Sequence, residues 1–593
     1  MMTDIFPQIR DLAIIGDRRT AALLTTTGTI VWYCPGRFDN PSLFASLLSP
    51  QAGSWSLQIP DARFVSRHYL GDSGVLETTL RTLQGELKIT DWMSIGEGTP
   101  RGICRRFSSV PELLTVSLQA APGYAQQSPN LRYQNQAVQI DRHYLYSSHP
   151  LKIVDEKAVE FSIPQGETGW AVLVDELLAG EITPDDWLET TLTCWQQIAA
   201  HATYSGPYEQ QIAASVRVLR LLTYEPSGGV IAAPTIALPE VIGGKRNYDY
   251  RYVWLRDAGM IVSALTRLGS DGMEERRFLD FICHSERDGK LPLYPFSTIT
   301  GQPVRPEETL DLKGYRSSQP VTIGNLARNQ LQLDAYGNVL LAAKLIYSRF
   351  ETRQHWTLIA QLADFLAEHW HEPDHGLWEE QVQRHYTSSK VIAACGLEYI
   401  AEFAQTEAQA QHWRTAARSI RGFVARECLT SEGAYAAIAG GDAVDLSAAL
   451  FPVWRYTAPD SQEMIMTLKI LERDYSSENL YRRHLEQFDS QQEGVFLAGT
   501  FWVAQYWVMR RDFPRVEAIL NAALKYANDL GQFGEEADPQ TGEMLGNFPQ
   551  SFVHAAFIGA VIDLKAALEP KEPLESKEPL ESKEPHDICE KQH

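Results

Sequence analysis

Four acidic residues lie within nine positions near the end of the chain, from Glu535 to Glu543. Gly546 and Pro549 break regular structure, and a mostly apolar run, residues 551–568, follows them. These acids are therefore expected on a loop at the entrance of a helix. Such a loop on a rigid helical scaffold suits carboxylate catalysis, although a solvated turn is the more usual place for surface acids.

A second acidic pair, Glu379 and Glu380, follows Trp378. The indole supplies apolar surface, which raises the pKa of a neighbouring carboxyl group by desolvation. One protonated carboxyl group and one ionised carboxylate are what glycoside hydrolysis with inversion needs, at a separation of about 6.5–9.5 Å. The alternative interpretation is an acid pair at a helix end with no chemical role.

The composition is that of a large globular protein. The chain has 593 residues, of which 44% are hydrophobic and 22% charged, enough for two to four domains. The formal net charge of -22 disfavours nucleic acid and anionic membranes as partners. Aromatic residues make up 10%, including 14 Trp and 24 Tyr, which fits both sugar binding and a large core.

The seven cysteines are scattered, without a CxxC pair or metal-ligand spacing. They are expected to be reduced thiols of a cytoplasmic protein. Residues 1–19 lack the pattern of a signal peptide. With no stretch of about 18 apolar residues identified, no membrane span is expected.

Residues 1–182 read as a domain of short antiparallel strands. Residues 21–24 and 29–33, on either side of Gly28, form a hairpin pattern, and later alternating runs include 158–163 and 169–174. Short strands separated by Gly and Pro predict a β-sandwich. Residues 183–207 are expected to form a helical linker.

Helical patterns dominate residues 208–569, the second predicted domain. About twelve helices are expected, near residues 208–224, 257–268, 273–285, 333–348, 354–371, 389–405, 408–427, 443–452, 460–473, 498–511, 513–529 and 550–568. Twelve helices of similar length favour six hairpins closed into an (α/α)6 barrel, and an α-solenoid would give a similar pattern.

Residues 570–593 contain a repeated Lys-Glu-Pro-Leu-Glu-Ser hexad. A charged repeat that is punctuated by proline cannot build a core. A disordered tail that takes no part in the chemistry is therefore predicted.

Four motifs in the same order give the chain a family resemblance. Residues 15–23 and 32–44 look like a trehalase-type N-terminal domain, and residues 247–258 and 534–550 look like two motifs of a helical catalytic domain. Together they resemble glycoside hydrolase family 15, which includes glucoamylases, glucodextranases and certain bacterial trehalases. The resemblance covers nearly the whole chain apart from the tail. It implies an N-terminal antiparallel β-sandwich followed by an (α/α)6 barrel.

The resemblance also implies roles for individual residues. Glu379 would be the general acid and Glu535 the general base. The glucose at the non-reducing end would be bound by a set of polar and aromatic side chains, namely Trp254, Arg256, Asp257, Trp378, Glu380 and Arg482. The segment from Arg483 to Gln492 departs from the family pattern because it is more charged than the usual Gly-rich loop.

The base is one of two adjacent residues, Glu535 and Glu536. Alignment of the motif favours Glu535, which also lies further from the following helix. Glu536 is then expected to brace the loop. Tyr248 and Tyr250 are further candidates for stacking on sugar rings, and His554 is expected to be a packing residue.

The predicted activity is exo-acting hydrolysis of an α-glucosidic bond with inversion, which releases β-D-glucose without a metal or another cofactor. The trehalase-type N-terminal motifs favour α,α-trehalose, and malto- or isomalto-oligosaccharides are the alternative substrates. A sugar phosphorylase and a non-catalytic carbohydrate-binding protein are alternatives of other classes. A phosphorylase needs a phosphate site, where Glu535 would repel the anion.

Overall fold

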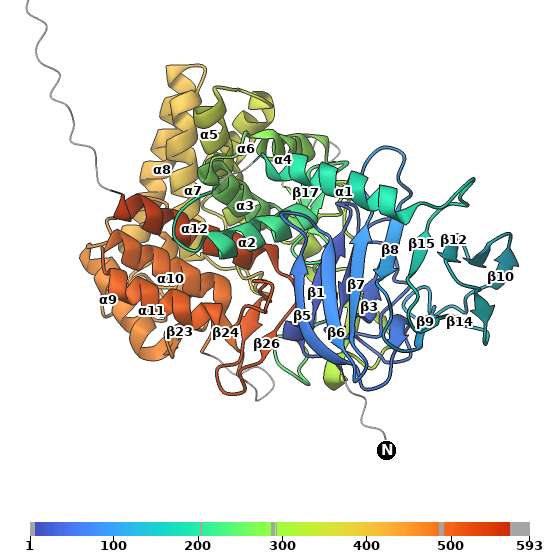
Figure 1. Cartoon of the computed structure of the whole chain (residues 1–593). Helices are drawn as coiled ribbons and strands as arrows, with labels where there is room; N and C mark the ends of the chain where they lie inside the picture. The colour runs from blue at the N-terminus through green and yellow to red at the C-terminus, as the bar shows by residue number, and fades with distance from the viewer. Residues whose placement is uncertain (1–5, 202–203, 286–290, 292, 486–491, 570–593) are drawn as a thin grey trace, which may run out of the picture.

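The computed structural model describes residues 6–201, 204–285, 291, 293–485 and 492–569. Figure 1 shows a β-sandwich beside a ring of helices. The strands of the sandwich come first in the chain, between Ala13 and Val174, and the helices follow. The predicted disordered tail, residues 570–593, lies outside the described residues.

Two antiparallel sheets form the sandwich, as the alternating patterns predicted. The seven-stranded sheet has the order β1 (Ala13–Gly16), β2 (Ala21–Leu24), β3 (Ile30–Tyr33), β4 (Ser54–Gln58), β9 (Leu114–Gln119), β14 (Ala158–Ile163) and β13 (Lys152–Ile153). The eight-stranded sheet has the order β10 (Leu131–Gln134), β11 (Ala137–Ile140), β12 (His143–Ser147), β15 (Gly169–Val174), β8 (Gly102–Phe107), β7 (Glu86–Met93), β6 (Leu76–Arg81) and β5 (Arg63–Tyr69). The predicted hairpin is the β2–β3 pair.

Because side chains alternate along each strand, successive residues of the sandwich strands pack into different hydrophobic cores, and these strands contribute to three such cores. Ile15 in β1 lies in the core between the two sheets, whereas the preceding Ile14 belongs to the core of the helical ring. In β15, Leu173 faces the sandwich core and Val172 faces the opposite side, where Leu188 packs. The outer face of β1–β3 is therefore part of the domain interface, and α1 (Pro184–Ala199) covers the eight-stranded sheet.

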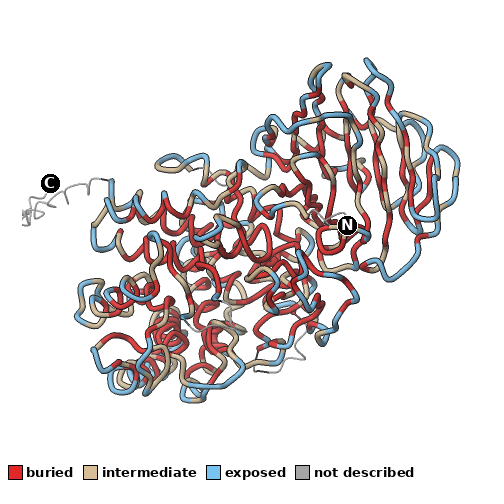
Figure 2. Tube along the Cα trace, turned by 90° about the horizontal axis from the view of Figure 1, so that it is seen from below, coloured by how far each residue is buried: buried red, intermediate tan, exposed pale blue. Residues whose placement is uncertain are grey.

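The helices form two concentric layers. The inner layer contains α3 (Leu255–Leu268), α5 (Leu333–Phe350), α7 (Thr387–Ile400), the 3-10 helix η5 (Leu446–Leu450), α10 (Leu497–Met509) and α12 (Ser551–Leu568). The outer layer contains α2 (Glu209–Leu221), α4 (Met273–His284), α6 (Trp356–His369), α8 (Glu407–Glu427), α9 (Gln462–Ile470) and α11 (Phe513–Leu524). Because α12 packs against α3, the array closes into an (α/α)6 barrel instead of continuing as a solenoid. Residues of the inner layer are more often buried than those of the outer layer, and Figure 2 shows buried residues running through the interior of both domains.

One predicted helix, over residues 443–452, is wrong. The segment forms only the five-residue 3-10 helix η5, which begins after Asp445, whose side chain accepts a hydrogen bond from the Ser447 N–H. Pro452 follows and has no backbone N–H to donate, so it cannot continue the ladder of helical hydrogen bonds, although Phe451 before it keeps helical φ and ψ of -57° and -43°. The element still occupies an inner position, because α10 packs against it.

The expectation that the chain has no long apolar stretch also needs correction. Within the described residues α12 alone has the length and composition of a membrane-crossing helix, with a mean hydropathy of 1.5. In the structure 67% of its residues are buried inside the protein. Because inner helices of a ring are surrounded by other helices, their apolar character extends all round the helix.

Candidate active site

The loops that lead into the inner helices meet at one end of the ring. β24 (Val495–Phe496), just before α10, pairs with β25 (Glu536–Ala537), and β25 pairs with β26 (Met544–Leu545) ahead of α12. β18 (Val253–Trp254) leads directly into α3. The contacts described below join these loops to the turn at residues 376–380, so the chemically interesting stretches of the sequence converge here.

Glu379 lies on the tight turn between α6 and α7. Its backbone is left-handed, with φ of 62°, and its backbone carbonyl accepts a hydrogen bond from Gln330 Nε2 at 3.1 Å. Trp254 Nε1 donates a hydrogen bond to Glu379 Oε1, and Arg256 Nη1 lies 3.6 Å from the same oxygen. Burial raises the pKa of Glu379, while Arg256 and the Trp254 hydrogen bond lower it. The net rise suits a carboxyl group that must deliver a proton.

Arg256 and Asp257 occupy the first turn of α3, where they form a fixed pair. Arg256 Nε donates to Asp257 Oδ1 at 2.8 Å, and Arg256 Nη1 donates to the carbonyl of Leu377. The guanidinium group thereby ties the helix start to the turn that carries Glu379. Burial raises the pKa of Asp257, and Arg256 opposes this rise.

Glu535 lies at the start of the acidic loop and is only 3% exposed. Tyr250 Oη donates a hydrogen bond to its Oε1 at 2.7 Å. Gly546 packs behind it, where an added Cβ would lie 2.6 Å from the Cβ of Glu535. Burial and the nearby Glu240 raise the pKa of Glu535 to about 8, against the lowering effect of Arg483 and of the Tyr250 hydrogen bond.

Two aromatic residues link the carboxyl groups. The Tyr250 and Trp254 rings lie edge to face with their centroids 5.6 Å apart, and each donates its polar hydrogen to one acid. The sequence predicted Tyr250 only as a ring that stacks on sugar. Its hydrogen bond to Glu535 was not predicted. Tyr248 does stack, but on Tyr250, at 6.5 Å with an interplanar angle of 7°.

Glu536 points away from Glu535 into a buried ionic cluster. The cluster consists of three acids and two arginines: Glu240, Glu493, Glu536, Arg246 and Arg483. Arg483 Nη2 lies 2.8 Å from Glu240 Oε2 and 3.4 Å from Glu536 Oε1. Burial and the two neighbouring acids raise the pKa of Glu536 well above its ordinary range. Glu536 is fully buried, so it is not a solvated acid, and its role in bracing the loop remains a prediction.

The spacing of three carboxyl groups in this cluster also satisfies a geometric test for a metal site, because Glu240, Glu493 and Glu536 have oxygen atoms within 4.8 Å of one another. Arg246 and Arg483 contact the same carboxyl groups. Their two positive charges offset most of the charge of the three acids, so the cluster is poorly suited to a metal cation.

Trp378, which was predicted to bind sugar, packs against other aromatic rings of the site. Its Nε1 donates to Asp445 Oδ2 at 2.7 Å, and its ring stacks on Trp502 at 6.0 Å. Arg483 lies over the Trp378 ring at 5.6 Å. These contacts fix the indole plane beside Glu379.

Glu380 and Arg482, the other two residues predicted to bind sugar, have different surroundings. The side chain of Glu380 is 40% exposed, and its Oε1 lies 4.0 Å from His484 Nε2. Arg482 donates from Nε to the carbonyl of Glu493 at 3.4 Å, whereas its neighbour Arg483 enters the ionic cluster beside Glu535. The roles of Glu380 and Arg482 in sugar binding remain predictions, and sequence reasoning missed Arg483.

Two carboxyl groups at the loop end of a six-hairpin ring suit hydrolysis of a glycosidic bond, so fold and site together point to a glycoside hydrolase. Comparison with known families agrees. Residues 206–510 and 516–562 match the Glycosyl hydrolases family 15, and residues 2–168 match the domain described as Trehalase-like, N-terminal. The chain belongs to glycosyl hydrolase family 15.

Relatives of similar length extend the comparison. Trehalase 1 of Sulfolobus acidocaldarius is 30% identical over 576 residues, which cover 94% of this chain and 99% of that protein. The trehalase of Mycobacterium tuberculosis is 30% identical and covers 95% and 90%. A bacterial glucoamylase solved in complex with acarbose superposes with a TM-score of 0.72 over 95% of this chain and 96% of that chain. At 14% identity this last likeness concerns the fold, and it confirms the predicted architecture.

Proposed function

We propose that this glycoside hydrolase cleaves α,α-trehalose with inversion. The observation that carries the proposal is the pair Glu379 and Glu535, each held by its own aromatic donor at the loop end of the ring. Relatives named as trehalases match this chain over nearly its whole length. We take α,α-trehalose as the substrate from the name of these relatives. The trehalase-like match over residues 2–168 agrees with that choice.

Glu379 acts as the general acid. It protonates the bridging oxygen as the bond to the attacked glucosyl carbon lengthens, and the other glucose leaves. Arg256, 3.6 Å from Glu379 Oε1, stabilises the carboxylate that remains. The departing sugar keeps its α configuration, because its own anomeric bond to oxygen is not broken.

Glu535 acts as the general base on the opposite face of the attacked sugar. It takes a proton from a water molecule as that water attacks the anomeric carbon, so the attacked residue leaves as β-glucose. Tyr250 holds Glu535 Oε1, and the second oxygen remains to orient the water. Hydroxyl groups of the attacked glucose bind to Arg256, Asp257 and Glu380, between Trp254 and Trp378.

The test is glucose release from trehalose, maltose, isomaltose, panose, dextran and starch by the purified protein. The highest kcat/KM is expected on trehalose. A preference for maltose or starch would assign a glucoamylase-type specificity, and a preference for isomaltose or dextran a glucodextranase type. Formation of glucose 1-phosphate in phosphate buffer would indicate a phosphorylase, and absence of turnover a binding protein.

A further inference from the structure

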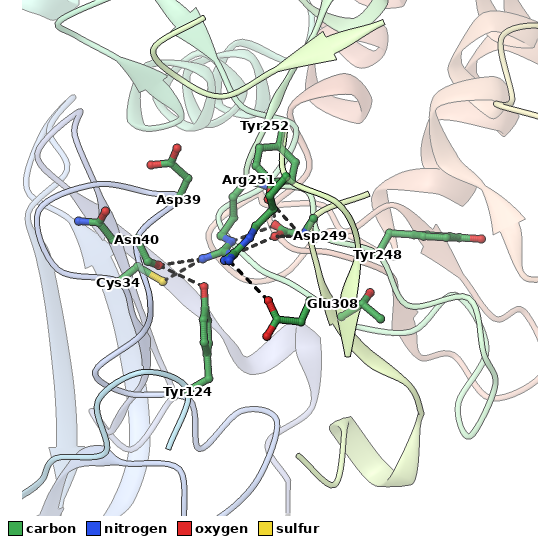
Figure 3. A network of polar contacts seen from close by, with 12 residues as sticks. Cys34, Asp39, Asn40, Tyr124, Tyr248, Asp249, Arg251, Tyr252 and Glu308 are labelled. Atoms are coloured by element: carbon green, nitrogen blue, oxygen red, sulfur yellow. Dashed lines mark hydrogen bonds and ion pairs between the residues drawn. The ribbon is translucent and has the colours of Figure 1, made fainter. Parts of the chain in front are cut away.

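The extended segment from Asn247 to Trp254 presents different residues to two domains. Its backbone is held by an isolated bridge between Asp249 and Ile236 and by hydrogen bonds, among them Ala233 N to Tyr250 O at 2.9 Å and Ala237 N to Tyr248 O at 2.9 Å. Successive side chains of an extended segment point to opposite sides. Tyr250 and Trp254 therefore face the two carboxyl groups, while Asp249 and Arg251 face the sandwich (Figure 3).

Arg251 docks this segment on the sandwich. Its side chain is 1% exposed, and Asp249 binds its Nε at 2.9 Å and its Nη2 at 2.8 Å. Its Nη1 donates to the carbonyl of Asn40 at 2.9 Å and contacts Cys34 Sγ at 3.6 Å. The guanidinium group also lies 5.6 Å from the centre of the Tyr124 ring, and Glu308 points toward it (Figure 3).

The loop that carries Glu535 docks on the same domain at a second place. Asn528 Nδ2 donates to the carbonyl of Leu12 at 2.8 Å, and Gln532 Nε2 donates to Tyr69 Oη at 2.8 Å. Glu535 follows Gln532 by three residues. The sandwich thus contacts both the segment that donates to the base and the loop that bears it.

We propose that the N-terminal sandwich positions the catalytic pair, and that Arg251 is the positioning residue through which it holds Tyr250 against Glu535. The proposal rests on the proposed function, in which Glu535 is the base. Arg251 contacts neither carboxyl group and lies on the far side of the segment from them. Its effect on the reaction passes through the backbone of its neighbour Tyr250.

A purely structural role for Arg251 is the competing explanation, and the sandwich offers a matched control. Arg105 is also fully buried, is bound by Asp91 at 2.7 Å, and donates to the carbonyls of Gly28 and Trp55. It lies on β8, within the sandwich, and has no part in the segment from Asn247 to Trp254. Lysine keeps the charge but not the planar fork of donors, so Arg251→Lys and Arg105→Lys impose the same chemical change at the two places.

The readout is the pH dependence of kcat/KM on trehalose, whose acidic limb follows the ionisation of the base in the free enzyme. The groups that face Glu535 are Tyr250, Glu240, Glu493 and Arg483, with Glu536 adjacent in sequence. The Tyr250 hydrogen bond lowers the pKa of Glu535, so its loss moves the acidic limb to higher pH. The proteins to compare are the wild type, Tyr250→Phe, Arg251→Lys and Arg105→Lys, together with the Tyr250→Phe/Arg251→Lys double variant.

Arg251→Lys is expected to lower kcat roughly tenfold, with a smaller change in KM, because small misplacements of reacting groups are costly. Its acidic limb should move upward in the same direction as that of Tyr250→Phe. In the double variant the second substitution should add little further shift, because the hydrogen bond is already absent. Arg105→Lys should lower the Tm while leaving kcat and the limb at wild-type values.

The proposal would be overturned if Arg251→Lys had the same kcat, and the same position of the acidic limb of kcat/KM, as Arg105→Lys. If Tyr250→Phe and Glu535→Ala are both fully active, Glu535 is not the base. That result would contradict the proposed function itself, separately from the role of Arg251. Should Arg251→Lys not fold, Tyr124→Leu replaces it. That substitution lies in the sandwich and removes the ring below Arg251, so a wild-type limb in this variant would equally overturn the proposal.

Discussion

The two carboxyl groups of the site, the proposed acid Glu379 and the proposed base Glu535, are held in different ways. Glu379 lies on a short turn, with a side chain that is 20% exposed and one cationic neighbour, Arg256. Glu535 is buried, and behind it lies a cluster of three further acids and two arginines. The acid therefore depends on few contacts close to it in space, whereas the base depends on a network.

This difference suits the two tasks. An acid must hold a proton and then release it to a leaving oxygen, so moderate burial beside a single arginine is sufficient. A base must be ionised although it is buried, so its charge has to be supported by surrounding groups. Arg483 gives part of that support, since it lowers the pKa of Glu535, but burial and Glu240 outweigh it and leave that pKa raised to about 8.

The largest effect is expected from removal of the base. Glu535→Ala should lower kcat on trehalose by about 10³-fold or more, because water loses its proton acceptor. The vacated space admits a small anion, so azide should restore turnover and give β-glucosyl azide. Recovery of an α-glucosyl azide would instead show that attack occurs from the other face, contrary to the assigned geometry.

Removal of the acid should have a smaller effect that depends on the leaving group. Glu379→Gln should lower kcat by at least about 10²-fold on trehalose, and much less on a glucoside whose leaving group departs without protonation. Steady-state kinetics on both substrates, with circular dichroism to establish folding, give the measurement. Equal losses on the two substrates would contradict the role of Glu379 as the acid.

The two aromatic donors should separate the two limbs of the pH profile. Tyr250→Phe should move the acidic limb of kcat/KM upward, because the lost hydrogen bond lowers the pKa of Glu535. Trp254→Phe should move the alkaline limb upward, because its hydrogen bond lowers the pKa of Glu379. If both variants shift the same limb, the assignment of one donor to each carboxyl group is wrong.

The smallest effect is expected at the neighbour of the base. Glu536→Gln should keep kcat within about threefold of wild type, since a neutral amide replaces a carboxyl group whose pKa is already raised. The matched variant is Glu535→Gln, which should be nearly inactive. The reverse pattern, with Glu535→Gln active and Glu536→Gln inactive, would show that Glu536 is the base.

Much of the fold was predictable because it follows local patterns. Alternation predicted the β2–β3 hairpin, and the apolar run after Gln550 predicted α12. The helix predicted over residues 443–452 was wrong because Pro452 and the Asp445 cap favour a short 3-10 element. Loop positions could not be derived from such patterns, because tertiary contacts determine them.

The site residues were predictable only where they lie in recognisable sequence motifs. The stretches around Glu379 and Glu535 stood out as clusters of acids, and the structure brings them together. The bond from Tyr250 to Glu535 joins residues 285 positions apart, so no local signal marks it. Arg483 was missed for the same reason, since its partners Glu240 and Glu493 come from different loops.

The most direct test of the acid–base mechanism is the anomeric composition of the first products from α,α-trehalose. Proton NMR in the first minutes, before mutarotation, resolves the α and β anomers of glucose. If Glu535 activates water opposite the departing sugar, the attacked residue appears as β-glucose and the departing one as α-glucose, in equal amounts. If α-glucose alone appears first, Glu535 acts as a nucleophile with retention, and its role as a general base is contradicted.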